Sequence, residues 1–248
     1  MKLTNLPISK RLLKCAELVP PCRTAVDLGT DHGYLGIYLL STGKCDELIA
    51  SDLREKPLAS ARANAAAFGV GARMRFVLSD GFENIGPGSF RTAVLAGMGG
   101  DLIANILAAA PWLDGGDYTL ILQPQSAAND LRRRLGERGW SIDRECLVRD
   151  GRFLYAVLSV RPAGGRPLSP GEQYVSPALR REGDPLFADY LARMRRALAL
   201  TVAGITQSRD PEDLARAAYY RDALAELQSL TDPSAKPSPR GEGIERSN

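Results

Sequence analysis

The chain has 248 residues, of which 44% are hydrophobic and 25% are charged, and its formal net charge at pH 7 is +3. These fractions are typical of soluble globular proteins and exclude a chain that is disordered throughout. The charge balance permits a nucleic-acid partner without requiring one, because such a partner needs a local basic patch rather than a large net charge.

Cysteine and histidine content narrows the possible chemistry. None of the four cysteines belongs to a C-x-x-C pair, which favours free thiols and a cytoplasmic protein over a zinc knuckle or a disulfide scaffold. His32 is the single histidine, so a multi-histidine metal site is excluded and we expect no metal. The N-terminal residues contain several basic side chains and no long apolar core, so we expect neither a signal peptide nor a membrane span.

Short apolar runs alternate with Ala-rich amphipathic stretches through the N-terminal two thirds of the chain. We expect strands at residues 24–28, 47–51, 74–78, 92–96 and 118–122, and helices at 34–41, 57–68, 101–110 and 127–138. This alternation predicts an α/β fold, with a parallel sheet covered by helices on both faces.

Two extended runs follow, at residues 142–149 and 152–160, and the Asp150-Gly151 dipeptide between them suits the type I′ turn of an antiparallel hairpin. A mostly parallel sheet that ends in such a hairpin resembles the Rossmann-like fold of class I S-adenosylmethionine (SAM) methyltransferases. It differs from the usual plan of an NAD-binding domain.

The C-terminal third has a different pattern. Residues 162–170 are rich in Gly and Pro, so we divide the chain into a Rossmann-like domain at 1–163 and a helical part at 171–230. An apolar heptad seam predicts one helix, and a second begins at Asp210-Pro211, so the two should form an antiparallel, coiled-coil-like helical hairpin. The first seam consists of Phe187, Leu191, Met194, Leu198, Thr201 and Ile205, and the second of Ala217, Tyr220, Leu224 and Leu227. Residues 231–248 have few apolar groups and are expected to be a disordered tail.

Acidic residues follow each of the first three predicted strands. Asp27 precedes a turn in which Asp31 lies between two glycines, where a pyrophosphate-binding turn would have the pattern G-x-G-x-x-G. An acid at position 31 would repel pyrophosphate and would suit a cationic ligand. Asp52 is placed to accept hydrogen bonds from ribose hydroxyls, and Asp80 from the amine of an adenine. Each motif also has a plain structural interpretation: a tight turn, a helix N-cap and an Asp-Gly loop.

Two further motifs follow the fourth and fifth strands. Residues 96–100, with the sequence Ala-Gly-Met-Gly-Gly, have little side-chain bulk, so a flat base could approach there. The alternative is a flexible loop capped by Asp101. Gln123 could pair with the edge of a base or could hold its own turn.

Basic side chains gather in three places: before the first strand, on the helix after the fifth strand, and on the first C-terminal helix. Such clusters are often simply solvated, but together they could follow an RNA backbone. The RNA-binding candidates, including the glutamine above, are Lys10, Arg11, Gln123, Arg132, Arg133, Arg193 and Arg196.

These motifs in combination resemble the bacterial TrmK family. The matching segments are Ile8–Leu12, the turn Asp27–Leu35, Ala96–Gly100 and Leu120–Pro124. The resemblance implies SAM as cofactor, tRNA as partner and methylation of N1 of adenosine 22 by direct attack of N1 on the methyl carbon. The cofactor residues that we predict are Asp27, Gly29, Thr30, Asp31, His32, Gly33, Tyr34, Asp52, Leu53, Asp80, Gly81, Ala96, Gly97 and Met98. The catalytic candidates are Asp27, Tyr34, Gly97, Met98 and Gly99.

Other functions stay open at this point. They are methylation of another RNA site or a small molecule, and a catalytically silent RNA-binding module of the same fold. A NAD-dependent dehydrogenase is disfavoured by Asp31 and by the missing glycine pattern. The sequence does not fix the oligomeric state, although a monomer is slightly favoured.

Overall fold

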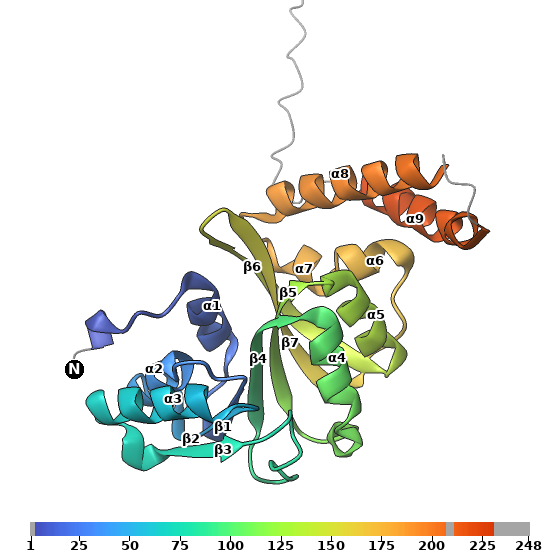
Figure 1. Cartoon of the computed structure of the whole chain (residues 1–248). Helices are drawn as coiled ribbons and strands as arrows, with labels where there is room; N and C mark the ends of the chain where they lie inside the picture. The colour runs from blue at the N-terminus through green and yellow to red at the C-terminus, as the bar shows by residue number, and fades with distance from the viewer. Residues whose placement is uncertain (1–2, 207–210, 231–248) are drawn as a thin grey trace, which may run out of the picture.

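The computed structural model describes residues 3–206 and 211–230 (Figure 1). Its strands are β1 (Cys22–Leu28), β2 (Cys45–Asp52), β3 (Met74–Leu78), β4 (Thr92–Gly99), β5 (Thr119–Ser126), β6 (Trp140–Asp150) and β7 (Phe153–Gly164). Its α-helices are α1 (Lys10–Leu18), α2 (Tyr34–Ser41), α3 (Glu55–Ala67), α4 (Gly100–Ala108), α5 (Ala128–Glu137), α6 (Pro170–Tyr174), α7 (Pro177–Glu182), α8 (Phe187–Thr206) and α9 (Pro211–Ser229). Short 3₁₀ helices lie at Leu3–Asn5, Gly71–Arg73 and Pro111–Leu113. Within the described residues, no helix combines the length and apolar character needed to cross a membrane.

The strands form one sheet in the order β3-β2-β1-β4-β5-β7-β6. The first five of these are parallel to one another, whereas β7 runs antiparallel to both β5 and β6. The predicted parallel sheet with a closing antiparallel hairpin is therefore confirmed. Because the five parallel strands run in one direction, the turns that follow them meet at one edge of the sheet.

Helices cover both faces of the sheet, with α1, α2 and α3 on one side and α4 and α5 on the other (Figure 1). Successive residues of β1 alternate between these sides. Val26 and Leu28 pack into the core that includes α4 and α5, and Ala25 packs into the core that includes α1 and α2. A central strand buried on both faces explains why its sequence is almost continuously apolar.

Helix α1 was not predicted from the sequence. Its N-cap is Ser9, whose side chain accepts a hydrogen bond from the Leu12 backbone N–H at 3.4 Å. Cys15, Ala16 and Leu18 form its buried face. Helix α1 contacts β4, β5, β6 and β7, so it covers the half of the sheet that α2 and α3 leave open.

The β6–β7 hairpin has a different turn from the one predicted. Asp150 is paired with Phe153, so the two turn residues are Gly151 and Arg152 rather than Asp150 and Gly151. Gly151 has φ +59°, and Arg152 is not among the residues with positive φ. A positive φ at the first turn position alone is the pattern of a type II′ turn, so the predicted type I′ turn is wrong.

The two helices of the C-terminal hairpin lie side by side at one end of the molecule (Figure 1). The buried seam residues Phe187, Leu191 and Leu198 of α8 belong to the same core as Leu227 of α9 and the sheet. Residues 170–182 form the short helices α6 and α7, which connect the sheet to this hairpin. The predicted division at 163/171 stays a prediction, and the expected tail at 231–248 lies outside the described residues.

Candidate cofactor and RNA site

The turn after β1 is held by backbone hydrogen bonds to the neighbouring strand. The N–H groups of Gly29 and Thr30 both donate to the Ser51 carbonyl, at 2.8 and 2.9 Å. Gly29 has φ +78°, and a Cβ there would lie 2.2 Å from Cε of Met98. The positive φ therefore favours glycine at position 29, whereas the flexible end of the Met98 side chain could move away from a Cβ.

Asp27 is the buried acid of this turn, with 6% of its surface exposed. Thr30 Oγ1 donates to its Oδ2 at 2.8 Å. Burial raises the pKa of Asp27 to about 6, the Thr30 hydrogen bond opposes this shift, and the nearby charge of Asp52 adds to it. A carboxylate with these properties gains energy from a cationic partner, because such a partner offsets the unfavourable burial of its charge.

The other two predicted acids lie at the same edge of the sheet. Asp52 ends β2, and its Oδ1 accepts a hydrogen bond from the Arg54 N–H at 2.9 Å, which leaves Oδ2 without a hydrogen bond in the described structure. Asp80 is exposed after β3. The N-cap of α3 is Arg54, so the alternative interpretation of Asp52 as that cap is wrong. Leu53 is 64% exposed beside Asp52, an unusual degree of exposure for a leucine.

A cavity of about 330 Å³ opens at this edge between α1, the β1 turn and β4. Its lining includes most of the predicted cofactor residues, namely Asp27, Gly29, Thr30, Asp31, His32, Gly33, Tyr34, Ala96 and Gly97. A second cavity, of about 450 Å³, begins at Asp80 and Gly81 and continues along α4. Asp52 ends β2, which lies between β1 and β3 in the sheet. The predicted residues therefore lie along one edge of the sheet that includes both cavities, and we call this edge the rim.

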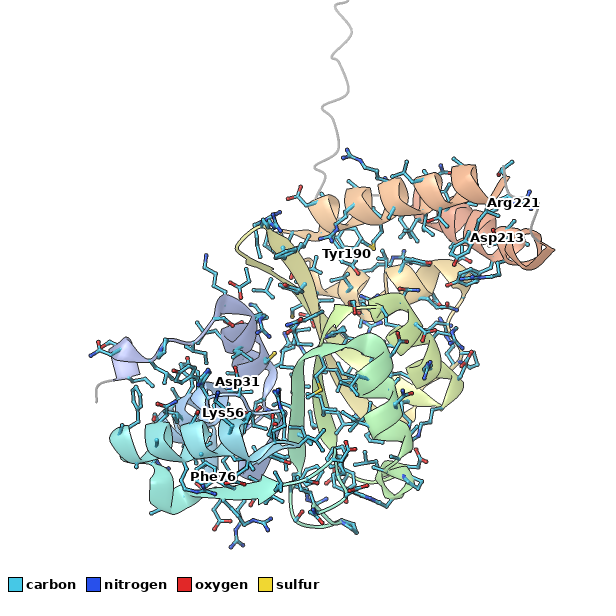
Figure 2. The ribbon with its side chains drawn as sticks, in the orientation of Figure 1. Asp31, Lys56, Phe76, Tyr190, Asp213 and Arg221 are labelled. Atoms are coloured by element: carbon cyan, nitrogen blue, oxygen red, sulfur yellow. The ribbon has the colours of Figure 1, made fainter. Side chains whose placement is uncertain are left out.

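Tyr34 and His32 form one side of the first cavity. Their rings stack with centroids 5.4 Å apart and an interplanar angle of 21°. The His32 carbonyl accepts a hydrogen bond from Asn64 Nδ2 of α3 at 2.9 Å, which fixes the turn. Asp31, labelled in Figure 2, is exposed next to this pair, and its Oδ2 lies 3.4 Å from Nε2 of His32.

The predicted cofactor residues do not include four N-terminal residues that also line this cavity. Pro7, Ser9, Arg11 and Leu12 line it, from the start of α1 and the residues before it. The only signal in the sequence was the Ile8–Leu12 segment of the family resemblance, and of its residues we predicted only Lys10 and Arg11 as functional, for RNA. In the structure, residues of this segment line the same cavity as the turn after β1.

Gln123 is buried with 0% of its surface exposed. Its Oε1 accepts hydrogen bonds from the Gly97 N–H and from Arg11 Nη1, both at 3.1 Å, and its Nε2 donates to the Pro124 carbonyl at 3.0 Å. The expectation that Gln123 contacts RNA is therefore wrong, because its side chain holds the ends of β4 and β5 together. Helix α4 is preceded by Gly99 as N-cap, so the alternative cap at Asp101 is also wrong.

Arg132 is not available to RNA either. It is fully buried on α5, where its guanidinium forms two hydrogen bonds to Glu145, at 2.5 and 3.2 Å. It also donates to the Gln173 carbonyl at 2.9 Å and to the hydroxyl of Tyr190 at 3.0 Å. Tyr190 belongs to α8 and is labelled in Figure 2. Burial lowers the pKa of Arg132, but the charge of Glu145, the nearby Tyr190 and the hydrogen bonds to both residues together outweigh this effect and raise the pKa. The predicted RNA contact is wrong because the sequence shows a basic cluster but not which member faces the core.

The remaining basic candidates differ in their surroundings. Arg133 is bonded to Asp130 at 2.5 Å and to Glu137 at 2.9 Å, so acids on its own helix balance its charge. Lys10, Arg193 and Arg196 are exposed and make no side-chain hydrogen bond or ion pair with described residues. These three stay predictions for RNA contact.

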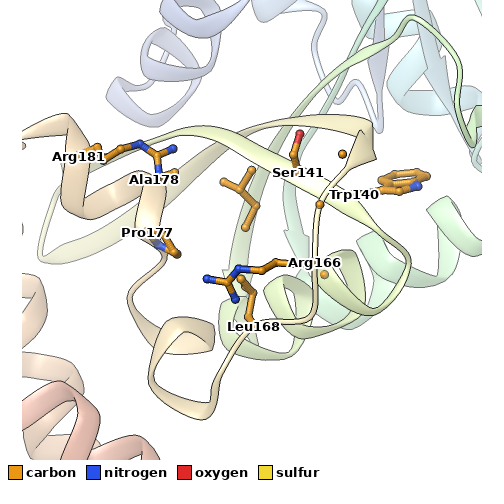
Figure 3. Close-up of a pocket in the computed structure, with 11 residues that line it drawn as sticks. Trp140, Ser141, Arg166, Leu168, Pro177, Ala178 and Arg181 are labelled. Atoms are coloured by element: carbon orange, nitrogen blue, oxygen red, sulfur yellow. The ribbon is translucent and has the colours of Figure 1, made fainter.

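A further cavity, of about 260 Å³, lies away from the cofactor rim (Figure 3). It is formed by the start of β6, the segment after β7 and α7, and its lining includes Trp140, Arg166, Leu168 and Arg181. Arg166 is bonded to both carboxylate oxygens of Glu172, at 2.6 and 2.7 Å. None of the predicted site residues lines this cavity.

Comparison with known proteins agrees with the geometry of the rim. The family described as "Methyltransferase domain" matches residues 8–158. The chain is 34% identical over 192 residues to the tRNA (adenine(22)-N(1))-methyltransferase of Bacillus subtilis (strain 168), and the alignment covers 75% of this chain and 80% of that protein. The chain belongs to the TrmK family.

Solved structures of TrmK proteins share the fold over almost their whole length. The B. subtilis m1A22 tRNA methyltransferase TrmK superimposes with a TM-score of 0.79 at 28% identity, covering 90% of this chain and 98% of that one. A Streptococcus pneumoniae protein described as a putative tRNA (m1A22) methyltransferase, solved in complex with SAM, has a TM-score of 0.74 at 28% identity, covering 88% of this chain and 99% of that one. The TrmK fold therefore extends through the C-terminal helices as well as the sheet.

Proposed function

We propose that this chain transfers the methyl group of SAM to N1 of adenosine 22 in tRNA. The observation that carries the proposal is the cavity at the carboxyl edge of the sheet, which contains the buried carboxylate of Asp27, in a chain of the TrmK family. The B. subtilis relative is named for this reaction, and the S. pneumoniae structure contains SAM. A tRNA-modifying enzyme works where tRNA is, so the proposal places the chain in the cytoplasm.

The residues at the rim suit SAM chemically. Asp27 and Asp31 are the acids of the first cavity. This cavity would hold the methionine part of SAM, so these acids would lie near its ammonium and sulfonium groups. Asp52 Oδ2 is free of hydrogen bonds in the described structure and suits a ribose hydroxyl, and the exposed Leu53 beside it offers an apolar surface. Asp80 suits the exocyclic amine of the adenine, and Gly81 (φ +52°) keeps the turn beside it free of side-chain bulk.

Bound SAM supplies a methyl carbon that is electrophilic because it is attached to a positively charged sulfur. N1 of a neutral adenine has an in-plane lone pair, so the chain needs no general base for the transfer. Its residues instead position the two reactants and exclude water. Gly97, Met98 and Gly99 at the end of β4 would border the target base, and Tyr34 would contact it or the cofactor.

The product base carries a positive charge, and the acids of the rim stabilise that charge as it develops. Because N1 lies on the pairing edge of adenine, a paired target must first turn out of its helix. The exposed Lys10, Arg193 and Arg196 would bind the tRNA body, mainly through phosphates and shape.

The test is methylation of a tRNA transcript with labelled SAM, followed by digestion to nucleosides. We expect label in 1-methyladenosine, and no label when nucleotide 22 of the transcript is guanosine. Asp27→Asn should abolish labelling. Asp46→Asn is the matched control, because Asp46 is an exposed acid near the start of β2, far from the rim.

Other outcomes would replace the proposal. Label in the guanosine-22 transcript would indicate another RNA site. Label in no RNA, with SAM bound, would indicate a different methyl acceptor or a silent RNA-binding module.

A further inference from the structure

The acidic cofactor cavity also contains a fixed positive charge, that of Arg11. Its side chain is 26% exposed and lines the cavity together with Asp27 and Asp31. Among the described lining residues, Arg11 is the one lysine or arginine. A permanent cation in a cavity otherwise suited to a cationic ligand requires a partner of negative charge.

The contacts of Arg11 fix its guanidinium at the end of β4. Nη1 donates to Gln123 Oε1 at 3.1 Å, and a Cβ at Gly97 would lie 2.9 Å from the same Nη1. The Arg11 backbone N–H donates to Asp150 Oδ2 at 3.4 Å, and Nε lies 4.0 Å from that oxygen. A guanidinium has five N–H donors, and in the described structure one hydrogen bond uses them. Nε forms the ion pair with Asp150, so the donors left for a ligand are the remaining N–H groups of Nη1 and Nη2.

Arg11 and Asp27 line the same cavity, and the charges of both influence one buried thiol. Burial raises the pKa of Cys15 to about 12, the charge of Arg11 opposes this shift, and the charge of Asp27 adds to it. A cation and an anion that line one small cavity match a zwitterion. The methionine part of SAM carries such a pair, an α-ammonium and an α-carboxylate.

We infer that Arg11 binds the α-carboxylate of SAM while Asp27 faces its ammonium, an inference that rests on the proposed function. It replaces the RNA contact that we predicted for Arg11. A guanidinium left unpaired beside the target base would oppose the positive charge that forms on the methylated adenine. Pairing with the carboxylate removes this conflict and sets which way round the methionine part enters the cavity.

The experiment measures the affinity of the full chain for SAM and for decarboxylated SAM by calorimetry. A charge-assisted, two-point contact should make the wild-type chain prefer SAM by about ten- to a hundred-fold. In Arg11→Ala this preference should fall to less than about three-fold. Because both ligands share the remaining contacts, the ratio cancels any general damage to the cavity.

Three other variants separate binding from structure. Lys10→Ala removes the neighbouring exposed charge and should keep the preference. Gln123→Ala removes the hydrogen bond that holds the guanidinium but leaves the guanidinium itself, so it should reduce the preference without abolishing it. Arg11→Gln gives the same readout as Arg11→Ala should the alanine variant fail to fold.

The outcomes are distinct. An unchanged preference in Arg11→Ala, or equal loss of both affinities with the preference intact, overturns the inference. A wild-type chain that binds SAM and decarboxylated SAM equally overturns it too. A wild-type chain that binds neither ligand overturns the proposed function instead.

Discussion

Under the proposed function, Asp27 should couple the binding of the methyl donor to pH. Its pKa in the free chain is about 6 because the carboxyl is buried. Cationic SAM favours the ionised form, so binding should weaken as Asp27 takes up a proton. With this pKa, the dissociation constant at about pH 5 should be roughly ten-fold larger than at about pH 7, equivalent to about 1.4 kcal/mol.

The same burial destabilises the free chain. A carboxyl whose pKa is raised on folding stabilises the fold below its ordinary pKa, and this contribution is lost as the pH rises through about 6. The shift from 3.8 to about 6 corresponds to an upper limit of about 3 kcal/mol at neutral pH. Asp27→Asn keeps an acceptor for Thr30 and removes the charge, so the variant should unfold at a higher temperature at pH 7.5 although it no longer binds SAM.

Calorimetry of SAM binding between pH 5 and pH 7, with thermal unfolding of the free chain over the same range, tests this reasoning. His32→Gln is the control, because His32 is a second titratable group that lines the cavity. It should retain the ten-fold dependence of SAM affinity on pH, whereas Asp27→Asn should show no SAM binding across this range. Affinity independent of pH in the wild-type chain, or an Asp27→Asn variant less stable than wild type at pH 7.5, would refute the argument.

The other predictions concern packing and RNA. Arg132→Met should destabilise the chain by about 3–5 kcal/mol in urea unfolding because it leaves Glu145 buried without its partner, and adding Glu145→Leu should restore much of that loss. Gly29→Ala should abolish SAM binding in calorimetry, whereas Gly43→Ala, also at positive φ but with open space around it, should affect only stability. Arg193→Ala should weaken tRNA binding and reduce its salt dependence by about one charge, measured by filter binding at several salt concentrations.

The strands and the acids that follow them were predictable because they depend on local pattern. Each predicted strand overlaps an observed one, and the helix predicted at 34–41 matches α2. Asp27, Asp52 and Asp80 lie at or just after the carboxyl ends of β1, β2 and β3, which are adjacent parallel strands. The topology alone therefore places these acids at one edge of the sheet. The predicted turn between β6 and β7 was placed one residue too early. The turn type depends on the register of the two strands, which the dipeptide alone does not specify.

The sequence did not predict which polar residues are buried. Arg132 and Arg133 are adjacent, yet one is a core ion pair and the other lies near the surface. The difference arises from contacts with β6 and with the helices after the sheet, 13 or more positions along the chain. Gln123 is similar, because its role at the end of β5 depends on α1, a helix that the prediction omitted.

The cavity and the C-terminal hairpin are held to a common strand. Asp150 at the end of β6 accepts a hydrogen bond from the Arg11 N–H, which fixes the start of α1 and with it one wall of the cavity. The Leu147 N–H of the same strand donates to Asp184 at 2.7 Å, in the segment that leads into α8. The distance between the cavity and a tRNA bound along α8 would therefore be set by β6 rather than by a hinge. Under the proposed function, selection of one adenosine in a folded tRNA requires such a fixed distance, because the RNA would be recognised mainly by its shape.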